Sequence, residues 1–303
     1  MSSPNPRNLP ASVQQRLINL ARAQRKDANL LMTRFALERY LYRLSRSPYA
    51  DAFVLKGAAL FVVWAGSDAR PTRDVDLLAR VEADLATVRR TVAAICRTEV
   101  EPDGLNFQPE AMQVEAIQAL RQFGGFRVIV PVLLGRTRLQ VQIDLGFGDA
   151  VTPAPQHLTY PTLLDFPAPQ LAAYHMETVI AEKLEAMIKL GTLNTRTKDY
   201  YDLLILSRAF PFNGQELTSS ILVTFSTRET AIPPGVPEGL SEAFANDAGA
   251  RSRWSAFLRR NDLPADHDWP EVVRALRDFL LPPFRTIGGE FQRTWPAGGP
   301  WQD

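Results

Sequence analysis

The chain has 303 residues, of which 46% are hydrophobic and 22% charged, and its formal net charge is +1. This composition is typical of a soluble globular protein with one large or two modest domains. The near-zero charge excludes a broadly basic nucleic-acid binder, so any RNA contact would need a local basic patch. A single cysteine, Cys96, excludes internal disulfides. The first residues lack an apolar signal segment, and no apolar run reaches the roughly 20 residues that cross a bilayer. We therefore expect a cytoplasmic protein without membrane contacts.

The first half of the chain, residues 1–150, is expected to form an α/β domain that opens with helices. Apolar residues at steps of three and four predict helices, and apolar residues in alternation or short runs predict strands. On these patterns we expect helices over 12–26, 27–47, 58–65 and 83–100, and strands over 52–57, 73–81, 107–114, 125–132 and 137–147.

The second half, residues 151–303, is expected to be mostly helical. Prolines between Pro153 and Pro169 predict an extended crossing segment. Helices follow over 175–191, where Gly191 is a suitable C-terminal stop, and over 198–210 and 271–281. The last stretch, rich in Gly, Pro and Trp, is expected to pack back as a tail. The fold class is α+β: a mixed sheet with flanking helices, then a helical C-terminal half.

Two segments place acidic side chains inside apolar strands. In "RDVDLL", Asp74 and Asp76 share one face of a strand because side chains alternate. In "LQVQIDLGF", Asp144 stands opposite the apolar face. If the two strands are neighbours, three carboxylates converge, and their natural occupant is Mg²⁺. The alternative is an exposed edge strand for the pair and a turn residue for Asp144.

Basic residues and a glycine precede the acidic pair. Gly57 lies between a strand and a helix, where backbone N–H groups can approach a phosphate. Lys56 and Arg73 add positive charge beside it. The alternative interpretations are a plain tight turn for Gly57 and a solvated strand end for Lys56.

Lys183 falls within the apolar stripe of its helix, while Glu182 and Glu185 are expected on the opposite, outer side. A lysine on an inward face needs an anionic partner, and a triphosphate is one candidate. The alternatives are a salt bridge to Asp199 or Asp202, or a side chain that reaches out to water. Arg196 and Lys198 make the loop before these aspartates a charged junction.

Four motifs in order resemble the AbiEii/AbiGii-type toxin family, over residues 34–208: "LKGAALFVVW…RPTRDVDLL", "VQIDLGFGD", "ETVIAEKLEAMIKL" and "NTRTKDYYDLL". The later "FSTRETAIPP" also looks familial. These are nucleotidyltransferase-like toxins of type IV toxin–antitoxin and abortive-infection systems, and the resemblance implies a core similar to the DNA polymerase β-type nucleotidyltransferase fold. Where the family has a second small donor, Gly or Ser, after Gly57, this chain has Ala58, which offers no hydroxyl.

The resemblance implies a Mg²⁺-dependent transfer of a nucleotide from an NTP to RNA, with the 3′ acceptor end of tRNA as the expected target. The implied metal ligands are Asp74, Asp76 and Asp144; the implied catalytic residues are these three with Lys183, Asp199 and Asp202; the implied nucleotide-binding residues are Lys56, Gly57, Thr72, Arg73, Lys183 and Arg196.

A cognate antitoxin and a monomeric state are further expectations. Two other functions stay open: a nucleotidyltransferase acting on a small molecule, and a nucleotide- or RNA-binding protein of the same fold without turnover. The arginines between Arg251 and Arg260 could contact phosphates or form a solvated helix face.

Overall fold

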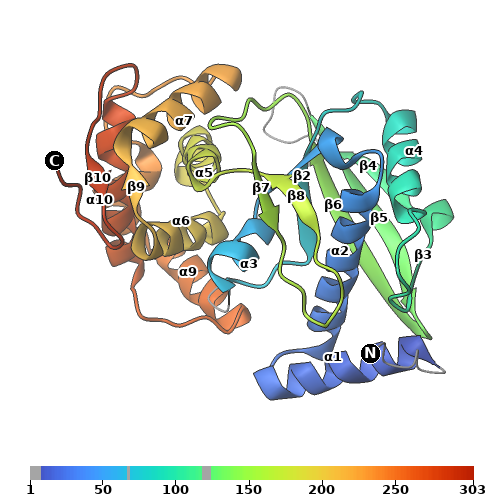
Figure 1. Cartoon of the computed structure of the whole chain (residues 1–303). Helices are drawn as coiled ribbons and strands as arrows, with labels where there is room; N and C mark the ends of the chain where they lie inside the picture. The colour runs from blue at the N-terminus through green and yellow to red at the C-terminus, as the bar shows by residue number, and fades with distance from the viewer. Residues whose placement is uncertain (1–7, 67–68, 118–123) are drawn as a thin grey trace. The chain divides into compact units, whose positions relative to one another are not determined.

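The computed structural model describes residues 8–66, 69–117 and 124–303; residues 1–7 of the proline-rich start lie outside the described part (Figure 1). The chain divides into two compact units. The first unit comprises Met1–Trp64, Pro71–Gly148 and Gln156–Ala173. The second comprises Ala65–Arg70, Asp149–Pro155 and Tyr174–Asp303.

One mixed sheet organises the first unit. Its strand order is β3-β5-β6-β2-β1-β8-β7, and β4 pairs with β5. The pairs β2–β6 and β1–β8 are parallel and the others antiparallel, which confirms the predicted mixed sheet. The bounds are β1 (Phe53–Lys56), β2 (Asp74–Ala79), β3 (Leu105–Phe107), β4 (Gln113–Ile117), β5 (Gly125–Leu134), β6 (Thr137–Gly146), β7 (Gln156–Thr159) and β8 (Gln170–Ala173).

The helices of this unit are α1 (Leu9–Gln24), α2 (Ala28–Arg46), α3 (Ala59–Trp64) and α4 (Leu85–Cys96). Figure 1 shows α2 lying along the sheet, and it contacts β6, β8 and α4. Asn8, Asp27 and Asp84 accept hydrogen bonds from the first turns of α1, α2 and α4, which fixes where these helices begin. Every second residue of β5 from Val128 to Leu134 and of β6 from Leu139 to Leu145 is buried, and these residues form the core beneath these helices.

The segment between β7 and β8 is tied to α2. Leu163 donates its backbone N–H to a carboxylate oxygen of Glu38 at 2.8 Å, and Arg39 donates to the carbonyl of Pro167 at 2.8 Å. Burial raises the pKa of Glu38 to about 7, against opposing effects of the Leu163 N–H and of two arginines. The predicted extended segment is thus a strap across α2, and the two short strands at its flanks join it to the sheet.

Where we expected one strand over 107–114, the structure has two. The 3-10 turn Pro109–Ala111 separates β3 from β4. Pro109 has no backbone N–H to donate to a sheet, so the chain turns there and resumes pairing at Gln113. The prediction of a continuous strand was wrong because it passed through this proline.

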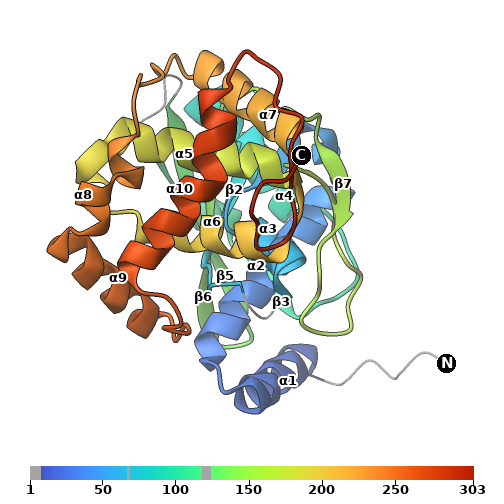
Figure 2. The same ribbon diagram turned by 90° about the vertical axis from the view of Figure 1, so that its left-hand side faces the viewer.

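The second unit is mostly helical, as predicted. Its elements are α5 (Met176–Leu190), α6 (Thr197–Ala209), α7 (Gly214–Thr227), α8 (Glu242–Ala245), α9 (Ala248–Arg260), α10 (Trp269–Arg285), and the strands β9 (Phe212–Asn213) and β10 (Thr294–Trp295). Figure 2 shows α10 crossing α6, and contacts join α10 to α6, α7, α8 and α9. α5 packs against α7 and ends at Gly191, which has a positive φ of 50°.

The C-terminal stretch packs back on this unit, which confirms the prediction of a tail. Trp295 donates its indole N–H to the carbonyl of Ser207 at 2.6 Å. The ring of Trp301 stacks on Phe279 with an interplanar angle of 8°. Among the described residues, the structure contains no helix with the length and apolar character needed to cross a bilayer.

Candidate active site

The strands that carry the predicted carboxylates are neighbours in the first unit. β2 and β6 run parallel, and their register pairs Asp76 with Asp144 and Asp74 with Gln142. Residues paired across neighbouring strands lie about 5 Å apart and point to the same side. The residues between these carboxylates are buried, whereas the carboxylates themselves are only partly covered. The structure therefore gathers Asp74, Asp76 and Asp144 on one face of the sheet.

The turn after β1 lies against this acidic face. Lys56 is the register partner of Asp76 on the other side of β2 and is only 2% exposed. Gly57 has a φ of 69°, and a Cβ at this position would lie 2.1 Å from Oδ2 of Asp76. Only glycine allows the carboxylate to approach the turn this closely. The close approach of Asp76 accounts for glycine at this position, and the predicted phosphate contacts of Lys56 and Gly57 stay predictions.

Arg127 is a site residue that the sequence interpretation missed. It is the register partner of Asp144 on β5, and its guanidinium holds that carboxylate through two hydrogen bonds of 2.9 and 2.7 Å. The bond to Asp144 raises the pKa of Arg127, and the charges of Asp144, Asp74 and Asp76 raise it further. This face therefore carries one charged residue on each of four neighbouring strands. We call these residues the charged row: Lys56 on β1, Asp76 on β2, Asp144 on β6 and Arg127 on β5.

The length of the β5–β6 turn could have revealed Arg127. Leu134 pairs with Thr137, so only Gly135 and Arg136 connect the strands. A two-residue hairpin fixes the register of every later pair. Counting outward from this turn places Arg127 opposite Asp144.

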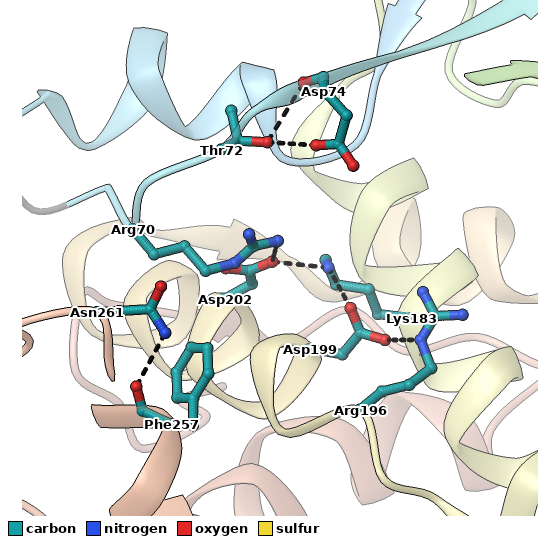
Figure 3. A network of polar contacts seen from close by, with 9 residues as sticks. All are labelled: Arg70, Thr72, Asp74, Lys183, Arg196, Asp199, Asp202, Phe257 and Asn261. Atoms are coloured by element: carbon teal, nitrogen blue, oxygen red, sulfur yellow. Dashed lines mark hydrogen bonds and ion pairs between the residues drawn. The ribbon is translucent and has the colours of Figure 1, made fainter. Parts of the chain in front are cut away.

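Thr72 and Arg73 precede the acidic strand. The hydroxyl of Thr72 donates to Oδ1 of Asp74 at 2.5 Å and lies 3.3 Å from the Asp74 carbonyl oxygen (Figure 3). It thereby orients the first carboxylate of the pair. Arg73 is exposed and lines a groove next to β6. The predicted contacts of both residues with phosphate remain predictions.

The second unit contains a buried charged cluster around Lys183. Its Nζ donates to Asp199 at 2.7 Å and to Asp202 at 2.8 Å (Figure 3). Arg196 donates to the other oxygen of Asp199 at 2.6 Å, and Arg70 binds both oxygens of Asp202 at 2.9 and 3.0 Å. The salt bridges considered in the sequence analysis are therefore present, and they join all four residues predicted in this half. Arg70 is an additional member that the sequence interpretation missed.

Neighbouring charges shift the pKa values of Asp199 and Lys183. Burial alone would raise the pKa of Asp199, but Lys183 and Arg196 outweigh it and lower the pKa to about 2. Burial would lower the pKa of Lys183, and the two aspartates raise it above its usual value. The cluster holds three cations, Lys183, Arg196 and Arg70, against two carboxylates.

The prediction that Glu185 lies on the outer, solvent-facing side of α5 was wrong. This side chain is 3% exposed, and it accepts hydrogen bonds from Arg228 at 2.9 Å and from the Thr230 hydroxyl at 2.6 Å. Arg228 also bridges to Glu182 at 2.6 Å and to Asp149 at 3.1 Å. The "FSTRET" segment thus covers the side of α5 that helical periodicity assigned to solvent. Periodicity shows which residues share a face, but not how many faces are covered.

The carboxylates of Asp74, Asp76 and Asp144 fit a hard divalent cation such as Mg²⁺, because they offer only oxygen ligands. No three His, Cys, Asp or Glu side chains of the described residues form a ready-made cage for an ion. Mg²⁺ is usually held by one or two carboxylates together with substrate phosphates.

Comparisons with known proteins agree with this chemistry. A family model described as the nucleotidyl transferase AbiEii toxin of type IV toxin–antitoxin systems matches residues 39–280. Since the match covers most of the chain, this chain belongs to the AbiEii family of nucleotidyltransferase toxins. The resemblance noted from the sequence is confirmed, and the family implies an NTP substrate and an antitoxin partner. A sequence search of curated proteins gives no significant match.

Two solved structures are similar to the chain over much of its length. MenT4, a nucleotidyltransferase toxin from Mycobacterium tuberculosis, aligns with 92% of this chain and 98% of its own, at 17% identity and a TM-score of 0.49. JHP933 from Helicobacter pylori aligns with 78% of this chain and 84% of its own, at 16% identity and a TM-score of 0.44.

Proposed function

We propose that this toxin transfers a nucleoside monophosphate from an NTP to the 3′-hydroxyl of an RNA, with Mg²⁺ as the metal and the tRNA acceptor end as the target. The observation that carries this proposal is the register pairing of Asp76 on β2 with Asp144 on β6. Asp74 lies two residues before Asp76 on the same face, and Lys56 and Arg127 flank the pair on the outer strands. Paired metal-binding carboxylates beside fixed cations suit the displacement of one phosphate oxygen by another.

In the proposed reaction, the acceptor oxygen attacks the α-phosphorus. A new bond forms from that oxygen to phosphorus, the bond to the bridging oxygen of the β-phosphate breaks, and pyrophosphate leaves. Bound Mg²⁺ supplies electrophilic stabilisation of the developing charge. Asp144 favours removal of the hydroxyl proton, and Thr72 holds Asp74 in one orientation. Lys56 and the N–H groups at Gly57 provide positive potential for the phosphates.

Lys183 and Arg196 belong to the same proposal as phosphate-binding residues, and Asp199 and Asp202 position them. The hydrogen bonds that hold the cationic groups of Lys183 and Arg196 in fixed positions support this assignment. Arg73 is proposed to contact the triphosphate. The arginines of α9 play no part in the proposal: Arg251, Arg259 and Arg260 are exposed on a helix, as in an ordinary solvated face. We propose a monomer in solution, which light scattering on the purified chain would test.

The test is incorporation of label from each of the four NTPs, with Mg²⁺ and total RNA. We expect label in an RNA band the size of tRNA, and we expect Asp76→Asn to abolish it. Asp51→Asn is a matched control, because Asp51 is an exposed aspartate in the 3-10 turn before β1. Label that appears only in small molecules would overturn the RNA proposal, and toxicity that survives Asp76→Asn would overturn the catalytic one.

A further inference from the structure

A groove of about 800 Å³ in the first unit, lined by both polar and apolar side chains, begins beside the charged row. Gln142, which lines it, is two residues from Asp144 on the same face of β6. The groove continues along that face past Gln140 to Arg138, and Arg73 lines it as well. At about 3.3 Å per residue, its lining residues Gln142 and Arg138 lie roughly 13 Å apart, and Arg138 lies roughly 20 Å from Asp144. Stacked nucleotides rise by about 3.4 Å each, so the groove is long enough for several of them.

The sheet leaves this groove open because β6 is longer than its neighbour. β2 begins at Asp74, which pairs with Gln142, so residues 137–141 of β6 extend past the start of β2. In the described sheet those residues pair only with β5. The floor on this face alternates amide with apolar groups, because Gln142 pairs with Ile129 and Gln140 with Pro131.

The side chains that line the groove suit a nucleic-acid strand better than the phosphates of a free nucleotide. Arg73 and Arg138 supply two positive charges, and glutamine amides can bond to base edges. Among the described lining residues none carries a carboxylate, so nothing there repels phosphodiesters. The apolar floor suits the faces of unpaired bases. Sequence-tolerant contacts of this kind are typical of single-stranded RNA sites.

The position of the groove relative to the carboxylates also suits an acceptor strand. Lys56 and Gly57, the proposed triphosphate contacts, adjoin Asp76 from β1. The groove lies on the other flank of β2, along β6. In a displacement at phosphorus, the attacking and leaving oxygens lie on opposite sides of the reacting atom. With a triphosphate at the turn on the β1 flank, an acceptor strand in the groove would reach the reacting phosphorus from the β6 flank.

We propose that this groove binds the single-stranded 3′-terminal nucleotides of the acceptor RNA, an inference that rests on the proposed function. Arg138 is the residue that tests it most cleanly, because it is exposed, lies about 20 Å from Asp144 and has a natural control. Arg136 is also exposed, lies two residues away in the same hairpin, and does not line the groove.

The experiment measures binding by the full chain of a fluorescein-labelled 12-nucleotide single-stranded RNA, and separately of a fluorescent NTP with Mg²⁺. We expect Arg138→Glu to weaken the RNA Kd about tenfold and to reduce its salt slope by about one. NTP affinity should stay within about twofold, and Arg136→Glu should change RNA affinity less than about threefold. Gln140→Glu, a smaller change on the groove floor, should act in the same direction.

Two results would overturn the groove proposal. If Arg138→Glu and Arg136→Glu weaken RNA binding equally, only general surface charge is involved. If NTP affinity falls while RNA affinity holds, the groove receives the nucleobase of the NTP. The activity itself is judged separately, by label transfer in the wild type and its loss in Asp76→Asn. A chain that transfers label but has equal Kd values in both arginine variants refutes the groove alone.

Discussion

Replacing Gly57 by alanine should disable the site while leaving the protein folded. The added Cβ would lie 2.1 Å from Oδ2 of Asp76, and real Cβ contacts essentially never fall below 3.0 Å. The carboxylate must therefore retreat. Rotation of the Asp76 side chain cannot suffice, because its own Cβ would be only 2.8 Å away. Strand β2 has to shift relative to the turn.

The expected magnitude has two parts. A non-glycine residue in the left-handed region costs about 1–2 kcal/mol, which for a chain of this size lowers Tm by about 2–8 °C. The displacement of Asp76 comes on top of that. Misplacing a reacting group by about 1 Å can reduce the rate by about 100-fold. We therefore expect a modest loss of stability and a large loss of transfer activity.

Gly288→Ala separates the two parts. Gly288 has a φ of 82°, and nothing lies within 4 Å of the Cβ that alanine would add. It carries the backbone cost without the clash. The assay compares initial rates of labelled NMP incorporation and melting curves for both variants. Should Gly57→Ala retain activity within about threefold of Gly288→Ala, the close approach of Asp76 to the turn would have no catalytic consequence.

Three further outcomes follow from the charges. Glu38 binds a proton on folding, so its contribution to stability is complete below pH 4.5 and is lost as pH rises through about 7. The free energy of unfolding should therefore fall by about 3 kcal/mol over this pH range in the wild type but not in Glu38→Gln, as melts from pH 5 to 8 would show. Lys183→Met should cost roughly 3–5 kcal/mol in denaturant unfolding, because it breaks the ion pairs with two buried carboxylates. Asp199→Asn should cost less in that background than in the wild-type chain, because the pair with Lys183 is already lost; a purely additive double variant would contradict this. Arg127→Gln should tighten Mn²⁺ binding about tenfold in calorimetry, because the guanidinium no longer competes for Asp144; unchanged affinity would show that it does not.

A site residue can be predicted from the sequence when its position depends on its own strand or helix, and not when it depends on a partner distant in the chain. Strand alternation placed Asp74, Asp76 and Asp144 on a polar face, because side-chain direction is fixed within each strand. That β2 and β6 are parallel neighbours required an assumption about topology. The structure supports the assumption.

The missed residues are those whose role depends on a partner distant in the chain. Arg127 lies among apolar residues of β5 and gains its role only from the hairpin register. Arg70 is four residues before Asp74, yet its partner is Asp202 in another part of the sequence. Glu185 was assigned to solvent because its cover, Arg228, comes from a loop more than 40 residues later. Local sequence patterns therefore predict which face of a strand or helix carries a side chain, whereas tertiary packing determines which residue it contacts.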